Sequence, residues 1–105
     1  MKNPADCANM TELRAVIDDL DRQLVALLRR RQDCIDRAAE LKPAEGMPAR
    51  ITARVEQVVA NVRAHAAGAG LDPALAEMLW RGMIDWSIAR EERVLGPSGP
   101  EGDGA

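Results

Sequence analysis

A chain of 105 residues, of which 47% are hydrophobic and 30% charged, has enough apolar material for one small core and enough charge to cover it. Phe and Tyr are absent, the aromatic residues are Trp80 and Trp86, and β-branched runs are scarce, so the composition excludes a typical β-rich fold and favours an all-α one. The formal net charge of −3, with basic residues scattered along the sequence, argues against a nucleic-acid-binding protein.

Residues 1–10, MKNPADCANM, are predicted to form a leader before the first helix. The leader lacks the apolar core of a signal peptide, and no run of about 18 apolar residues follows it, so we expect a cytoplasmic protein that does not contact a membrane. Cys7 lies in this leader and Cys34 in a helical segment. This pattern predicts two free thiols, and neither a disulfide framework nor a metal site.

A long helix is predicted from Thr11, a suitable N-cap residue, to the residue before Pro43. Its apolar residues recur at heptad-like intervals, at Leu13, Ile17, Leu20, Leu24 and Leu27. A helix of about 31 residues is about 46 Å long, whereas a compact chain of this size is only about 33 Å across. Because two shorter helices cannot cover this seam, we expect an obligate homodimer in which the long helices intertwine.

A second helix is predicted after a loop at residues 43–49, which contains two prolines and a glycine. Apolar residues from Ile51 to Ala66 follow at helical spacing. The GAG sequence of residues 68–70 is a typical glycine stop, so we expect the second helix to end there.

A third helix is predicted to open at Asp72 and Pro73, which form a strong N-cap and N1 pair. This segment is apolar on more than one side, so it should be the most buried helix and pack between its neighbours. Residues 11–95 form the predicted helical domain. Residues 96–105, GPSGPEGDGA, have no core-forming side chain and are expected to be a frayed tail.

Arg31 occupies a position on the heptad-like seam where the pattern requires an apolar side chain. Because an unpaired buried charge is costly, this arginine needs either a partner or an anion. Lys42 lies eleven residues further along the same helix, within about 20° of the same face, so both side chains can lean towards one small anion. The alternative is that Arg31 bends to solvent and that Lys42 only favours the helix C-terminus.

Ser87 and Glu91 lie four residues apart on the third predicted helix and therefore share a face. A carboxylate in a helix that is apolar on several sides is either paired with an arginine or driven towards its protonated form. Arg14 flanks the seam and Arg54 flanks the second helix, and each alone is more typical of a surface charge. His65 has no second His or Cys at ligand spacing, and no nucleophile motif or Gly-rich phosphate loop occurs. An enzyme with this sequence is expected to use no metal and no cofactor.

The chain resembles the all-helical, AroQ-type chorismate mutases and the related isochorismate-pyruvate lyases in four stretches taken together: LRAVIDDLDRQLVALLRRR, ELK, PARITARVEQV and GLDPALAEMLWRGMIDWSIAREE. The resemblance covers residues 3–95. Its most specific parts, in chain order, are an Arg-x-x-Ile-Asp-x-x-Asp opening from Arg14 to Asp21, the arginines that end at Arg31, and the lysine before the loop.

The resemblance implies a pocket for a small cyclohexadiene with two carboxylates. The residues that it assigns to substrate binding are Arg14, Arg31, Lys42, Arg54, Ser87 and Glu91. Arg14 would reach into the pocket of the other subunit, and Lys42 and Glu91 would be the catalytic pair. Glu91 stands where the family usually has a glutamine that donates to the substrate's ether oxygen. A carboxyl group donates only when it is protonated, so Glu91 would have to act as an acid.

The resemblance leaves more than one activity open. A mutase converts chorismate to prephenate by holding the compact diaxial conformer and stabilising charge on the ether oxygen, whereas a lyase forms salicylate and pyruvate from isochorismate. Many mutases hold the ring hydroxyl with an acidic pair whose positions correspond here to Ile51 and Val55, and the leader is also lyase-like. Ser87 favours a mutase. We expect a chorismate mutase, with the lyase and a non-catalytic helical dimer module as alternatives.

Overall fold

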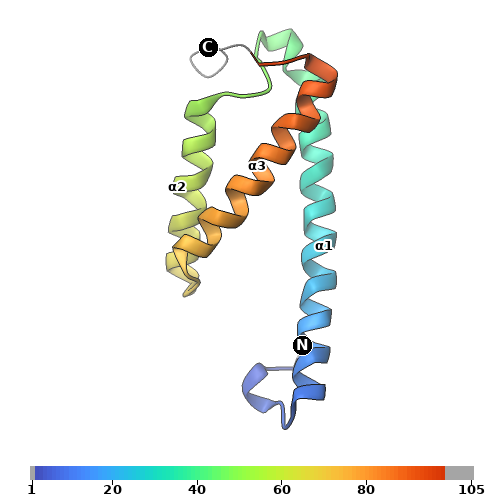
Figure 1. Cartoon of the computed structure of the whole chain (residues 1–105), viewed down its shortest axis with the longest axis vertical. Coiled ribbons are helices and arrows are strands. Elements are labelled where there is room, and N and C mark those ends of the chain that lie inside the picture. The colour runs from blue at the N-terminus through green and yellow to red at the C-terminus, as the bar shows by residue number, and fades with distance from the viewer. Residues whose placement is uncertain (1, 99–105) are drawn as a thin grey trace. The chain divides into compact units, whose positions relative to one another are not determined.

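The computed structural model describes residues 2–98, and within them it confirms the predicted all-α fold (Figure 1). The elements are the 3-10 turns η1 (Pro4–Asp6) and η2 (Pro43–Glu45) and the helices α1 (Met10–Leu41), α2 (Thr52–Ala69) and α3 (Pro73–Leu95). The chain divides into two compact units, Met1–Asp33 and Cys34–Ala105, and α1 contributes residues to both. None of the described helices is long and apolar enough to span a membrane.

The first turn of α1 is capped by Asn9, and not by Thr11 as the sequence predicted. Asn9 Oδ1 accepts a hydrogen bond of 2.9 Å from the backbone N–H of Glu12. The Glu12 carboxylate in turn accepts hydrogen bonds from the backbone N–H of Ala8, at 2.8 Å, and from Lys2 Nζ, at 2.9 Å. These hydrogen bonds, the one from Ala8 first, lower the pKa of Glu12. The reciprocal arrangement resembles a capping box and ties the leader to the helix.

The first unit has almost no core of its own. Val16 is the one buried side chain among residues 2–33. Along α1 the seam residues Ile17, Leu20, Leu24 and Leu27 have exposed fractions of 46%, 39%, 56% and 58%. An apolar stripe of this length is too large to be ordinary scattered surface residues, so it is a candidate interaction surface.

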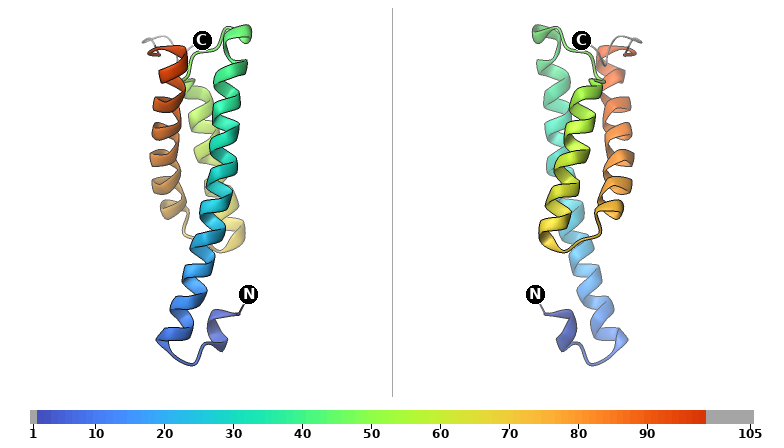
Figure 2. Two further views of the ribbon diagram at one scale, coloured as in Figure 1. Left: turned by 90° about the vertical axis from the view of Figure 1, so that its right-hand side faces the viewer. Right: turned by 90° about the vertical axis from the view of Figure 1, so that its left-hand side faces the viewer.

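The second unit holds the hydrophobic core, where α2 and α3 pack side by side (Figure 2). Its buried cluster comprises Ala49, Val59, Ile84 and Ile88, and it is flanked by the partly buried side chains of Val55, Val58, Trp80 and Leu95. The turn between α2 and α3 is formed by the glycine stop and the aspartate N-cap that the sequence predicted. Gly70, with a φ of 78°, ends α2, and Asp72 Oδ1 accepts a 2.9 Å hydrogen bond from the backbone N–H of Ala74 at the start of α3.

Charged side chains bridge α2 and α3 on the outside of this core. Arg81 donates to both oxygens of Glu56, at 3.1 and 3.2 Å, and to Glu77 at 2.7 Å. Hydrogen bonds from Arg81 are the main cause of the lowered pKa values of the Glu56 and Glu77 carboxyl groups. Arg63 donates to Glu77 as well, at 2.8 Å. Because these side chains are largely in contact with solvent, their ion pairs add little to the free energy of unfolding. We infer that they mainly set the alignment of α2 with α3.

Helix α3 has more buried residues than the other helices of the described chain, as predicted: Ala76, Ile84, Ser87, Ile88 and Glu91. Met78 and Leu79 on this helix remain exposed within the chain, whereas the sequence predicted that α3 packs between neighbours. At the start of the expected frayed tail, Gly96 and Ser98 are hydrogen-bonded to other residues of the second unit. The remainder of that tail lies outside the described residues.

Candidate functional site

A buried ion pair joins the end of α1 to the C-terminal part of α3. Lys42 directly follows the last residue of α1, and its Nζ lies 2.7 Å from Glu91 Oε1. The Glu91 side chain is 5% exposed and the Lys42 side chain 18%. The sequence predicted that a carboxylate here would be paired with an arginine or protonated, and the observed partner is instead a lysine. The structure thus brings together the two residues predicted to be catalytic.

The hydrogen bonding of this pair is incomplete. Although Lys42 Nζ is within ion-pair distance, Glu91 Oε1 receives no well-directed hydrogen bond from any described residue. Lys42 Nζ does donate a hydrogen bond of 2.8 Å to the backbone carbonyl of Ala49, which is itself buried. An ammonium group has three donors, and buried polar atoms in folded proteins are nearly always satisfied. Both Lys42 and Glu91 therefore retain hydrogen-bonding capacity for a ligand.

Ser87 lies on the same face of α3 as Glu91, one turn earlier, and is 5% exposed. Helix geometry places residues four apart beside each other, so the buried hydroxyl and the buried carboxylate face the same region. Because the surrounding residues of α3 are apolar, two buried polar groups on one stripe are unusual for a purely structural helix. The prediction that Ser87 and Glu91 share one face of the helix is confirmed.

The position of α3 against the end of α1 depends on a bidentate ion pair that the sequence did not reveal. Arg90 donates from Nε to Asp36 Oδ1 at 2.6 Å and from Nη2 to Asp36 Oδ2 at 3.1 Å. The Arg90 guanidinium also lies 5.5 Å from the ring centroid of Trp86. The hydrogen bond to Asp36 raises the pKa of Arg90. Since Arg90 adjoins Glu91, this clamp fixes where the Glu91 carboxylate meets Lys42.

The other arginines predicted to bind substrate are Arg14, Arg31 and Arg54. Arg54 is exposed on the first turn of α2 and donates a 2.8 Å hydrogen bond to Gln57 Oε1. Arg14 is exposed and has no ion pair within residues 2–98, whereas Arg31 is half-buried. Both belong to the first unit, Met1–Asp33. Their roles in ligand binding stay predictions.

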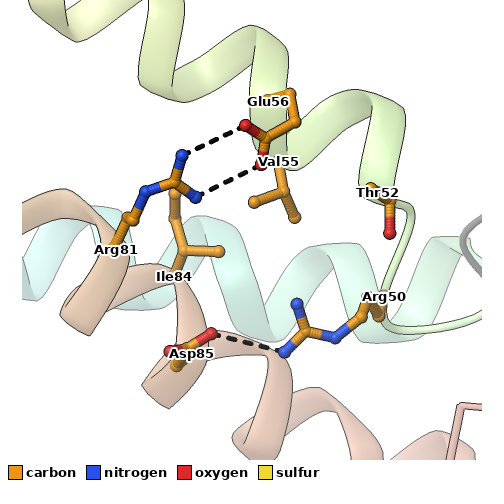
Figure 3. Close-up of a pocket in the computed structure, with 7 residues that line it drawn as sticks. All are labelled: Arg50, Thr52, Val55, Glu56, Arg81, Ile84 and Asp85. Carbon is orange, nitrogen blue, oxygen red and sulfur yellow. Dashed lines mark hydrogen bonds and ion pairs between the residues drawn. The ribbon is translucent and has the colours of Figure 1, made fainter. Parts of the chain in front are cut away.

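A pocket of about 110 Å³ lies between α2 and α3, apart from the Lys42–Glu91 pair (Figure 3). Its lining residues are Arg50, Thr52, Val55, Glu56, Arg81, Ile84 and Asp85. The two arginines already have carboxylate partners, because Arg50 lies 3.3 Å from Asp85 and Arg81 lies 3.1 Å from Glu56. This pocket is therefore a poor anion site. Within residues 2–98 there is also no group of three or more His, Cys, Asp or Glu side chains that could hold a metal ion.

Comparisons with known proteins match residues from both units. The family described as chorismate mutase type II matches residues 13–92, which include all six predicted site residues. An isochorismate pyruvate lyase of Pseudomonas aeruginosa is 34% identical over 92 residues, or 87% of this chain and 89% of the lyase. A T-protein of Enterobacter agglomerans is 31% identical over 84 residues, which cover 80% of this chain but only 22% of the T-protein.

The ion pair predicts an asymmetry between single and double replacements. Lys42→Met leaves Glu91 buried without its cation, and should lower the free energy of unfolding by about 3 kcal/mol, the scale for breaking a buried pair. Lys42→Met combined with Glu91→Gln should recover most of that loss because no buried charge remains. Denaturant unfolding measures both, with Lys2→Met as the matched control at an exposed lysine. A double variant no more stable than Lys42→Met would show that Lys42 does not compensate the Glu91 charge.

Proposed function

The chain belongs to the chorismate mutase type II family, and we propose that it catalyses a pericyclic reaction of a small cyclohexadiene dicarboxylate around Lys42 and Glu91. The observation that carries this proposal is the buried Lys42–Glu91 pair, with an ammonium and a carboxyl oxygen that both have unused hydrogen-bonding capacity. Ser87 adds a buried hydroxyl on the same face of α3. Such groups suit a ligand that carries both negative charge and an ether oxygen.

The chemistry needs only the kinds of group that these residues supply. In both reactions of the family the ether C–O bond of an enolpyruvyl substrate breaks, and negative charge grows on the ether oxygen. A lysine ammonium aimed at that oxygen stabilises the charge, and a protonated Glu91 can donate to it. Binding the substrate in its compact conformer supplies the rest of the rate enhancement, since bond breaking and bond making occur in one molecule.

We assign the substrate's carboxylates to the arginines, which bind such groups bidentately. Arg31 and Arg54 would act within their own chain and Arg14 from a second copy. The second copy is supported by the exposed apolar seam of α1 from Ile17 to Leu27, which a homodimer with paired long helices would bury. An obligate dimer also accounts for the nearly coreless first unit, because its stability would then depend on association.

Of the two reactions, we favour elimination of pyruvate from isochorismate. Ile51 is half-buried and Val55 packs against the core cluster, so the wall where many mutases carry an acidic pair is apolar. The nearby carboxylates of Glu56 and Asp85 are engaged by Arg81 and Arg50. A relative matched over 89% of its length also has the name of a lyase. In this elimination the ether C–O bond breaks and a ring hydrogen moves to the enolpyruvyl methylene carbon, giving salicylate and pyruvate.

Chorismate mutase activity is the second candidate, and Ser87 favours it. The family's mutases place a serine at this position of the third helix, and here the hydroxyl is buried beside Glu91. The sequence alone led us to expect the mutase for this reason. The engaged carboxylates of Glu56 and Asp85 and the lyase name of the matched relative outweigh that argument here.

Product analysis separates these activities. The purified protein, incubated separately with chorismate and with isochorismate, should release salicylate and pyruvate from isochorismate, as identified by chromatography. Lys42→Met should slow this turnover by about 100-fold or more, the scale for losing one preorganised donor, while Lys2→Met should not change it. Prephenate from chorismate as the main product would favour the mutase instead. Turnover of neither substrate would support the non-catalytic dimer module.

Subunit mixing tests the shared site. Arg14→Ala and Arg31→Ala chains should each be nearly inactive alone, because every site in either homodimer lacks one arginine. After both chains are unfolded and refolded together, a mixed dimer has one site with both defects and one intact site. Random association then restores about a quarter of the wild-type sites. Exchange confirmed by mass spectrometry without any recovered turnover would contradict the assignment of Arg14 to the partner's pocket.

A further inference from the structure

The segment Gly96–Ser98, here called the strap, folds back from the end of α3 onto the connection between α1 and α2. Ser98 Oγ accepts a hydrogen bond of 2.9 Å from the backbone N–H of Arg50, which is 48 residues away in sequence. The backbone N–H of Ser98 donates a 2.8 Å hydrogen bond to Glu92 Oε2. Glu92 lies in the last turn of α3, and hydrogen bonds from the Ser98 backbone and side chain lower its pKa. Ser98 is therefore hydrogen-bonded both to the connection between α1 and α2 and to α3.

Arg50, which is bonded to the strap, is the neighbour of Ala49, which is bonded to Lys42. Arg50 directly follows Ala49, whose backbone carbonyl accepts the 2.8 Å hydrogen bond from Lys42 Nζ. A peptide plane joins the Ala49 carbonyl to the Arg50 N–H, so these two groups move together. One hydrogen bond of this peptide goes to the strap and the other to the lysine. Displacing the Arg50 N–H would therefore rotate the carbonyl away from Lys42.

Apart from the strap, this peptide is held by the burial of Ala49 in the core cluster and by the ion pair of the Arg50 side chain with Asp85. An open groove of about 310 Å³ lies between the 43–49 loop and the end of α3, lined by residues of both. Its walls include Met47 and Val94, which are exposed at 43% and 71% and so do not close over it. Beside this open groove, the Ser98 hydroxyl links the end of α3 directly to the backbone N–H of Arg50.

We propose that Ser98 is a positioning residue for the Lys42 ammonium, acting through the Arg50 N–H and the Ala49 carbonyl, an inference whose catalytic consequence rests on the proposed function. The strap sets the orientation of one peptide plane, and this plane directs one of the three lysine protons away from the ligand. The other two protons are then available to Glu91 and to the substrate. Without the hydroxyl, the ammonium is free to turn towards the groove and solvent.

Chemical labelling tests the positioning without any substrate. The sequence contains only two lysines, Lys2 and Lys42, so Lys2 serves as an internal control for reagent and pH. Brief acetylation with an N-hydroxysuccinimide ester, followed by peptide mass spectrometry, measures the labelling of Lys42 relative to Lys2. Ser98→Ala should raise this ratio about five-fold, the factor that one net hydrogen bond corresponds to. Ser98→Thr, which keeps the hydroxyl, should restore the wild-type ratio.

Arg93→Ala is the matched control, because Arg93 is exposed in the last turn of α3 and lies outside the strap. It should leave the labelling ratio unchanged. Far-UV circular dichroism should be the same for all variants, which separates local release of Lys42 from loss of fold. A ratio that stays at the wild-type value in Ser98→Ala, or rises equally in Ser98→Thr, would overturn the positioning role.

Kinetics test the catalytic consequence on whichever substrate the wild-type chain converts. Ser98→Ala should lower kcat about five-fold with a smaller change in KM. The reason is that the Lys42 ammonium interacts most strongly with the transition state, in which charge develops on the ether oxygen. Ser98→Thr should restore kcat. Raised Lys42 labelling with unchanged kcat would overturn the link to catalysis. If the wild-type chain converts neither substrate, the proposed function fails, while the labelling ratio still decides whether Ser98 positions Lys42.

Discussion

Placing the Glu91 carboxylate in an apolar region next to Lys42 is the constraint on which the second unit depends. Removing two charges from water is costly, and their attraction offsets that cost only when the geometry is well held. The Arg90–Asp36 pair holds α3 against the end of α1, and the Ala49 carbonyl holds the lysine. The core of α2 and α3 then supplies the low-dielectric surroundings that make the pair useful to a charged ligand.

For the proposed function, this arrangement would place a lysine and a carboxyl group together against the ether oxygen of an enolpyruvyl substrate. In the absence of a ligand, the ammonium stabilises the carboxylate 2.7 Å away. In the proposed function, a dianionic substrate in the site would share the Lys42 ammonium with Glu91, so one lysine would contact both. The proposed chemistry thus depends on one coupled pair, and the strap is the device that keeps its lysine directed inward.

Local signals in the sequence predicted most of the fold. The ends of α2 and α3 follow from Gly70, Asp72 and Pro73, whose effects depend only on neighbouring residues. The choice of Asn9 over Thr11 as the N-cap was missed because both residues can cap, and the contact of Glu12 with Ala8 and Lys2 decides between them. A helix boundary that depends on such reciprocal contacts cannot be predicted from the residue type at a single position.

The candidate site was predictable in its polar residues and not in their pairing. Lys42, Ser87 and Glu91 stand out in the sequence as polar groups at positions of interest, but the sequence predicted an arginine partner or a protonated state for Glu91, and the structure shows Lys42 as its partner. The ion pair of Arg90 has no signal in the sequence, because its partner Asp36 is 54 residues away and lies on another helix. Ser98 was placed in a tail for the same reason. Long-range partners depend on tertiary packing, for which the helical period carries no signal.

The most direct test of the central claim is the pH dependence of turnover for wild-type protein and for Glu91→Gln. An ionised Glu91 cannot donate to the ether oxygen and opposes the charge that develops there, so wild-type turnover should fall as the pH rises. Glutamine keeps a donor but does not ionise, so Glu91→Gln should flatten this limb and keep its activity at neutral and alkaline pH. A wild-type rate that is level from mildly acidic to alkaline pH, with Glu91→Gln no less pH-dependent, would contradict the assignment of Glu91 as a donor to the substrate.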